Sequence, residues 1–113
     1  MPKVYRGIRT TDGVRVTVYG HDGAASPLQH HRQHSPDGFE WGYAGSGPAD
    51  LALALCIDVL GSVPATAVYQ AVKNDLIAGI ASDSWELSDA AVLDSIARAR
   101  HVSGHVDGRE PVQ

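Results

Sequence analysis

Residues 44–60 read AGSGPADLALALCIDVL, and this stretch decides the fold. Glycine permits a sharp turn and proline is favoured at the first helical position, so we expect a turn followed by a helix over residues 48–60. Gly47 is the expected N-cap, with Asp50 in the first turn and Asp58 reaching solvent near the end. The other positions are apolar nearly all round, which is typical of a buried central helix. The helix is too short to span a membrane.

Upstream, alternating apolar residues predict two β-strands over residues 3–9 and 14–20. The Asp12-Gly13 turn between them predicts a β-hairpin. Arg15 and Thr17 are expected on one face of this hairpin. The opposite face is expected to be aliphatic, and it would consist of Val4, Ile8, Val14, Val16 and Val18.

Glycines and prolines interrupt residues 21–38, which predicts a loop before the central helix. Phe39, Trp41 and Tyr43 then alternate with other residues. This alternation predicts a third short strand whose aromatic rings face the core.

Downstream of the central helix, Gly61 is expected to end it. A second helix is predicted over about residues 64–78, and residues 85–87 have the alternation of an edge strand. Ser88 is expected to cap a third helix that ends near Arg100. The inward-facing residues of this third helix are expected to be Leu93, Ile96 and Ala97.

Together these elements predict an α+β fold, in which a small antiparallel sheet of three or four strands packs against about three helices around a buried central helix. Residues 1–100 would form a single domain. Residues 101–113 contain two glycines and a proline without periodicity, and we expect a mobile C-terminal tail.

Composition narrows the class of protein. The chain has 113 residues, 43% of them hydrophobic, and one cysteine, which excludes an intramolecular disulfide framework and a four-cysteine zinc site. Cys56 falls within the apolar helix, where a small buried side chain is expected rather than a reactive thiol. No apolar run is long enough to span a bilayer, and the first residues lack the apolar core of a signal peptide, so we expect a cytoplasmic protein without membrane contact.

The net charge of −4 is unevenly distributed. Residues 1–47 have one more basic than acidic residue, whereas residues 48–113 have an excess of five acidic residues. A nucleic-acid partner is therefore not expected, because such proteins usually carry a basic surface stripe.

Residues 38–52, GFEWGYAGSGPADLA, resemble a core motif, GFEWGYxGSGPAxLA, of a family of small uncharacterised proteins from bacteria, phages and plasmids. The similarity extends from the Tyr5-Arg6-Gly7 opening to about Leu93. The family is known only as a domain of unknown function. The resemblance implies a compact α+β domain and a phage or mobile-element context, and it implies no reaction.

The turn formed by Gly45, Ser46 and Gly47 has two interpretations. Backbone N–H groups at a helix N-terminus bind anions, so the turn could hold a phosphate, nucleotide or carboxylate. The alternative is a purely structural turn. We favour the alternative because no lysine follows, as it would in a Walker loop, and because Asp50 would repel an anion.

Three histidines, His30, His31 and His34, are weak candidates for a metal site, since two histidines four residues apart can share a helix face and a zinc ion. Pro36 would truncate such a helix, and a polar loop is the alternative. We expect no cofactor. Ser46 or Ser35 could also pair with His34 and an aspartate as a nucleophile, but the chain is too short for the sheet of an α/β-hydrolase.

Aromatic and basic residues are candidates for macromolecular contacts. Trp41 and Tyr43 could anchor an interface, or they could be core aromatics. His34 is a further candidate, and the basic residues that could form a patch are Arg6, Arg9, Arg15 and Arg32. Four exposed arginines are also ordinary on a solvated surface, and we favour that interpretation over a patch.

The favoured function is that of a small non-enzymatic accessory or inhibitor-like protein, of phage or mobile-element type, that binds another macromolecule. The partner would be a protein, and a homodimer is possible through an edge strand or the third helix. One alternative is a small-ligand sensor that binds an anionic metabolite or nucleotide at the GSGP turn. Another is a metal-dependent or hydrolytic enzyme that uses the histidines.

Overall fold

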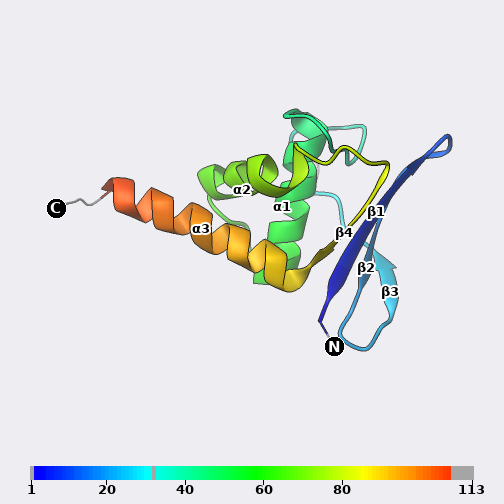
Figure 1. Ribbon diagram of the computed structural model, residues 1–113, viewed down its shortest axis with the longest axis horizontal. Coiled ribbons are helices and arrows are strands. Elements are labelled where there is room, and N and C mark those ends of the chain that lie inside the picture. The colour runs from blue at the N-terminus through cyan, green and yellow to red at the C-terminus, as the bar shows by residue number, and fades with distance from the viewer. Residues whose placement is uncertain (1, 32, 108–113) are drawn as a thin grey trace.

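The computed structural model describes residues 2–31 and 33–107, with side chains as far as His101. Helices cover one side of a small sheet, and the other side of the sheet faces away from them (Figure 1). The elements, in chain order, are β1 (Val4–Thr10), β2 (Gly13–Tyr19), β3 (Ala25–Pro27), α1 (Ser46–Leu60), α2 (Thr66–Val72), the π-helical turn η1 (Lys73–Ile77), β4 (Ser84–Ser88) and α3 (Asp89–Asp107). The predicted α+β fold is confirmed.

The sheet is antiparallel, with strand order β3-β2-β1-β4. The predicted hairpin is confirmed as β1 and β2, whose turn contains Gly13 at a φ of 119°. The predicted edge strand is confirmed as β4, which pairs with β1. Strands that are 80 residues apart in sequence, such as those carrying Arg6 and Glu86, therefore lie side by side.

The predicted strand over residues 39–43 is wrong, because this segment is irregular. The Gly42 N–H donates to the Ile77 carbonyl, and the Trp41 indole N–H donates to the Ser82 carbonyl. The segment is thus held by the η1 end and the segment before β4 rather than by a neighbouring strand. The third strand of the sheet is instead β3, which lies within the region that was expected to be a loop.

The hairpin faces were predicted correctly for β2 and wrongly for β1. Val16 and Val18 are buried, but β1 directs Tyr5 and Gly7 toward the core and leaves Ile8 48% exposed. A side chain at Gly7 would collide with the indole of Trp85, which packs against this position. Tyr5 and Trp85 thus fill the apolar space on the inner side of β1. Val4 and Ile8 lie on the opposite side of the strand.

The central helix α1 is buried as predicted, and Gly61 ends it in the left-handed conformation with φ 73°. The N-cap is Gly45 rather than Gly47, and the first turn has no acidic residue. Asp50 is 1% exposed and contacts the loop before the helix, so it does not serve the helix start. Asp58 also has a different role from the predicted one. Its carboxylate accepts hydrogen bonds from a residue of β1 and from the residue that precedes β1.

The second predicted helix is confirmed as α2 and η1, which run without a break. In α3 the Ser88 hydroxyl accepts a hydrogen bond from the Ala91 N–H, as a cap should. Ile96 faces inward as predicted, but Leu93 and Ala97 are exposed. The buried positions of α3 are Val92, Ser95, Ile96 and Ala99.

The helix α3 continues to Asp107, past the end expected near Arg100. The remainder of the predicted mobile tail, residues 108–113, lies outside the described residues.

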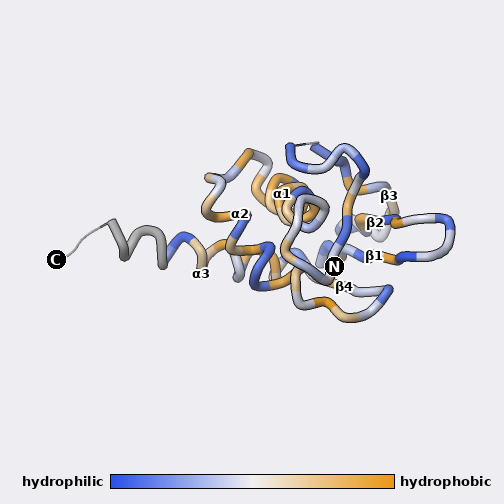
Figure 2. Tube along the Cα trace, turned by 90° about the horizontal axis from the view of Figure 1, so that it is seen from above, coloured by the Kyte–Doolittle hydropathy of each residue, from blue (hydrophilic) through white to orange (hydrophobic). Residues whose placement is uncertain are grey.

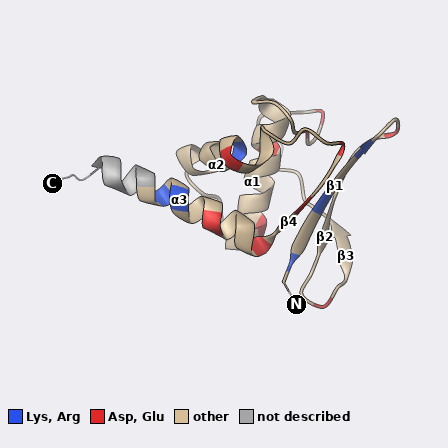
Figure 3. Ribbon diagram, in the orientation of Figure 1, with Lys and Arg blue, Asp and Glu red and all other residues tan. Residues whose placement is uncertain are grey.

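Figure 2 shows α1 nearly end-on and mostly hydrophobic, between the sheet and the other two helices. Figure 3 shows basic positions following one another along β1, whereas acidic positions cluster where β4 meets α3. Within the described residues, no helix is long and apolar enough to cross a membrane.

Candidate functional site

The glycine-rich turn before α1 is filled by neighbouring side chains. The first helical hydrogen bond runs from the Ala49 N–H to the Gly45 carbonyl. The ring of Tyr43 packs on Gly45, where an added Cβ would lie 2.3 Å from it. A Cβ on Gly47 would lie 2.8 Å from the Cβ of Glu40. A side chain at Gly47 would therefore press on the Cβ and backbone of Glu40, whereas one at Gly45 would displace the half-exposed ring of Tyr43.

This packing bears on the predicted anion site at Gly45, Ser46 and Gly47. A groove of about 580 Å³ borders Ser46 and Gly47, and Asp37, Glu40 and Arg9 line it as well. Arg9 forms an ion pair with Glu40, so the carboxylate of Asp37 leaves this lining with a net negative charge, which repels a bound anion. The arrangement favours the structural interpretation of the turn, and anion binding there stays a prediction.

Arg9 connects the hairpin to this loop. Its guanidinium donates to the Glu40 carboxylate at 2.6 Å, to the Asp83 carboxylate at 2.7 Å and to the Trp41 carbonyl at 3.1 Å. It also lies over the Trp41 ring, 4.6 Å from the centroid. Hydrogen bonds to Glu40 and Asp83 raise its pKa. The sequence made Arg9 a candidate for a basic patch or for an ordinary solvated surface, but it is a structural cross-link on the helix side of the sheet.

The two aromatic candidates differ in their exposure to solvent. Trp41 is 1% exposed and meets Trp85 edge to face, so it is a core residue and no surface anchor. Tyr43 is 51% exposed and remains accessible to a partner.

Asp50 organises the histidine-containing loop. Its buried carboxylate accepts hydrogen bonds from the backbone N–H groups of His34 and Ser35, at 2.8 and 2.9 Å, and contacts His30 Nε2 at 2.8 Å. Burial alone would raise its pKa, but the hydrogen bonds from His30, Ser35 and His34 outweigh that effect and lower it. A charged carboxylate inside the protein therefore fastens the loop to α1.

The three histidines do not converge. The imidazole of His30 contacts Asp50 and packs on Phe39, whereas that of His34 contacts the Tyr69 hydroxyl at 2.6 Å. His31 borders a separate hollow of about 280 Å³ near the end of α1. Among the described residues, no group of three histidine, cysteine, aspartate or glutamate side chains is placed to hold a metal ion.

The predicted nucleophile pairs are not brought together either. The hydroxyl of Ser35 accepts from the Asp37 N–H, and His34 bonds Tyr69. Cys56 is buried as expected, and burial raises the pKa of its thiol to about 12, so it stays protonated and unreactive in the folded protein.

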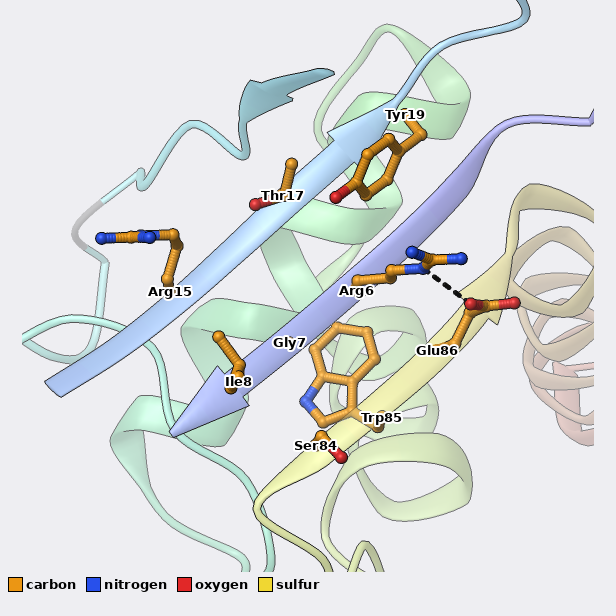
Figure 4. A pocket seen from close by; sticks show the side chains of 9 residues that line it. All are labelled: Arg6, Gly7, Ile8, Arg15, Thr17, Tyr19, Ser84, Trp85 and Glu86. Atoms are coloured by element: carbon orange, nitrogen blue, oxygen red, sulfur yellow. Dashed lines mark hydrogen bonds and ion pairs between the residues drawn. The ribbon is translucent and has the colours of Figure 1, made fainter. Parts of the chain in front are cut away.

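The outer sheet face is the surface that the helices leave uncovered, and Figure 4 shows it from close by. The cross-strand pairing of β2, β1 and β4 places the side chains of this face next to one another. The residues of this outer sheet face are Arg6, Ile8, Arg15, Thr17, Tyr19, Ser84 and Glu86, and they border a shallow hollow of about 530 Å³.

Arg6 lies at the centre of this face. Its Nε donates to the Glu86 carboxylate at 2.7 Å, and its guanidinium lies 5.0 Å from the centroid of the Tyr19 ring. The hydrogen bond and the charge of Glu86 raise the pKa of Arg6, so it is fully protonated. Figure 4 shows Arg6 directed toward β4, and Arg15 directed away from it at the other side of β2.

The face therefore includes two of the predicted contact residues, Arg6 and Arg15. Arg32 lies outside the described residues. Sequence reasoning missed Ile8, Tyr19 and Glu86. The alternation of β1 indicated that Arg6 and Ile8 share a face, but nothing local showed which face the helices cover.

These observations define a small α+β protein with one open sheet face. Residues 5–98 match a family of unknown function (DUF6166), and the chain belongs to this family. No curated protein and no solved structure matches the chain. Membership confirms the expectation of a family of unknown function, and it assigns no activity.

Proposed function

We propose that this protein is a non-enzymatic accessory or inhibitor-like protein that binds another protein through its outer sheet face. The observation that carries the proposal is the uncovered side of the four-stranded sheet, where helices pack on the opposite side alone. A two-layer domain needs just one buried sheet face for its core, so the second face is free to recognise a partner.

The chemistry of the outer sheet face supports this role. Arginine and tyrosine are enriched at protein interfaces, and this face presents Arg6, Arg15 and Tyr19. Ile8 adds a large apolar side chain that is 48% exposed on β1, an inner strand of the sheet. Such a mixture of apolar and polar groups is typical of the interfaces between proteins that bind each other reversibly.

The biological setting is part of the same proposal. The resemblance of the GFEWGY–GSGP segment to proteins of bacteria, phages and plasmids supports a protein borne by a mobile element that acts on a host machine in the cytoplasm. This inference is an analogy to the family and does not depend on the geometry of the face.

The test compares two similarly exposed apolar positions, one on the sheet and one on α3. Ile8 lies on the outer sheet face, whereas Leu93, 44% exposed, lies on α3. Tagged wild type, Ile8→Asp and Leu93→Asp are cross-linked in host cells and purified. We expect wild type and Leu93→Asp to recover one stoichiometric partner and Ile8→Asp to recover about tenfold less.

Circular dichroism and thermal melting of each variant check that it is folded. Recovery of no stoichiometric partner by the wild type contradicts the proposed function. Equal recovery by Ile8→Asp and wild type contradicts the outer sheet face as the binding surface.

A further inference from the structure

The residues of the outer sheet face include more positively charged than negatively charged side chains. Arg6 has an ion-pair partner, Glu86, on the neighbouring strand. Arg15 is exposed, and within the described part of the chain no carboxylate lies within ion-pair distance of it. The residues of this face thus include two guanidinium groups and one carboxylate. Asp12 borders a neighbouring hollow with Ile8 and Arg15, but no ion pair joins it to Arg15 in the described residues, so Arg15 is the guanidinium without an ion-pair partner.

Arginine presents planar N–H donors that match the geometry of a carboxylate. Arg6 is already oriented by Glu86 and Tyr19, so a partner that binds it loses less side-chain entropy than with a free arginine. Ile8 lies directly across from Arg15 in the strand register. An apolar contact at Ile8 would exclude water beside Arg15 and so strengthen an ion pair there.

Resting on the proposed function, we propose that the partner contributes an acidic, extended protein segment that crosses β2 and β1. One of its carboxylates binds Arg15, a second binds Arg6, and an apolar side chain between them packs on Ile8. The charge complementarity of this face with an acidic segment carries the assignment.

The strand geometry fits such a segment. Arg15 and Arg6 are diagonal neighbours on adjacent strands, and such neighbours lie ~7–8 Å apart, with their Cβ atoms somewhat closer. Their side chains extend to opposite sides of the strand pair (Figure 4), which widens the separation of the two charges. An extended chain repeats its side chains on one face every ~6.6–6.8 Å. Acidic residues at the first and fifth positions, with an apolar residue at the third, therefore span the two arginines.

Two other occupants fit less well. A nucleic acid needs many phosphate contacts, whereas this face offers two cations, an acidic residue and an exposed isoleucine. A second copy of the chain would bring the same face, whose carboxylate on Glu86 is already paired with Arg6. Both occupants are outcomes of the experiment below.

The probe is a capped, labelled peptide in which two glutamates flank a valine, each two positions away, in a serine background. Binding is followed by amide chemical shifts of the isotope-labelled full chain. We expect shifts confined to β1, β2 and β4, and roughly tenfold weaker binding of Arg15→Gln and Arg15→Glu. Arg100→Glu, on exposed α3, is the matched control and is expected to bind as wild type does.

Added salt should weaken binding, because exposed ion pairs are screened over about 8 Å at physiological ionic strength. The same peptide with lysine in place of glutamate should not bind. The inference is overturned by no shifts at about 5 mM peptide, by equal binding of Arg15→Glu and Arg100→Glu, or by tighter binding of a single-stranded oligonucleotide of equal charge. Concentration-dependent shifts of the same amides without peptide would instead indicate a second copy and would also overturn it.

Failure of this inference is distinguishable from failure of the proposed function. If partner recovery is lost in Ile8→Asp but unchanged in Arg15→Gln and Arg15→Glu, the outer sheet face binds a partner and the acidic segment is wrong. If recovery is insensitive to Ile8→Asp as well, the proposed face itself is wrong. Arg15 has no structural ion pair in the described residues, so its substitution is expected to leave the fold intact.

Discussion

The buried carboxylate of Asp50 offers the sharpest test of how this fold is held together. Asp50→Asn preserves the size of the side chain and removes its charge. Oδ1 accepts from the His34 N–H at 2.8 Å, and Oδ2 accepts from the Ser35 N–H at 2.9 Å while contacting His30 at 2.8 Å. Asparagine has one oxygen and one NH₂ group, so in either orientation its NH₂ faces a backbone N–H donor.

At least one charge-assisted hydrogen bond is therefore lost, and the others become weaker. Hydrogen bonds to charged groups contribute about 1.5–3 kcal/mol each. The expected loss in the free energy of unfolding is about 2–4 kcal/mol, because one bond disappears and a buried donor is left without an acceptor. For a domain of this size, the loss corresponds to a fall in Tm of roughly 8–16 °C.

The effect should also depend on pH in one direction. The hydrogen bonds hold the pKa of Asp50 below its ordinary value in the folded protein. A lowered folded-state pKa stabilises the protein above the unfolded-state pKa of about 3.9, and this stabilisation is lost as pH falls through the folded-state value. The difference between wild type and Asp50→Asn should thus be full near neutral pH and shrink below about pH 4.

Chemical denaturation of both proteins across this pH range measures the difference. Asp94→Asn, at an exposed ion pair with Arg98 on α3, is the control and should cost less than about 1 kcal/mol. The reasoning is refuted if Asp50→Asn destabilises no more than Asp94→Asn, or if its effect grows as the pH is lowered.

Two further predictions concern close packing. Gly47→Ala should destabilise the protein by about 1–3 kcal/mol, because the new methyl group would press on Glu40. The control Gly79→Ala should not destabilise it, because its methyl group would meet no atom within 4 Å. Urea denaturation compares the two variants, and equal stabilities would contradict the packing argument. Cys56 should not react with a thiol reagent at pH 8 in the folded protein and should react promptly in urea, since burial raises its pKa to about 12. Rapid labelling of the native protein would show that α1 is accessible.

Local sequence signals were sufficient where one short segment determines its own conformation. The Asp12-Gly13 turn with its flanking alternation produced the hairpin. The apolar run after Pro48 produced the buried helix, and Gly61 ended it because glycine adopts a positive φ at little cost. The family resemblance rested on a similarly contiguous stretch, and the match over residues 5–98 confirms membership of a family of unknown function.

The candidate site depended on contacts that no local pattern contains. The outer sheet face exists because β4 pairs with β1, which brings Glu86 to Arg6 across 80 residues of sequence. Which side of β1 faces inward was decided by Tyr5, whose hydroxyl donates to Asp58 on α1 at 2.6 Å. A rule of aliphatic alternation could not anticipate an aromatic residue with a distant polar partner.

The sequence by itself determined the class of fold, the buried central helix and the family, since periodicity, turn residues and a contiguous motif are local properties. Only the tertiary structure decided that the segment around Trp41 is a loop, that Asp50 fastens the preceding loop and that Arg9 is a cross-link rather than part of a surface patch. The physical reason is that a hydrogen bond or ion pair depends on which partner lies within about 3 Å in the folded chain, whatever its distance in sequence.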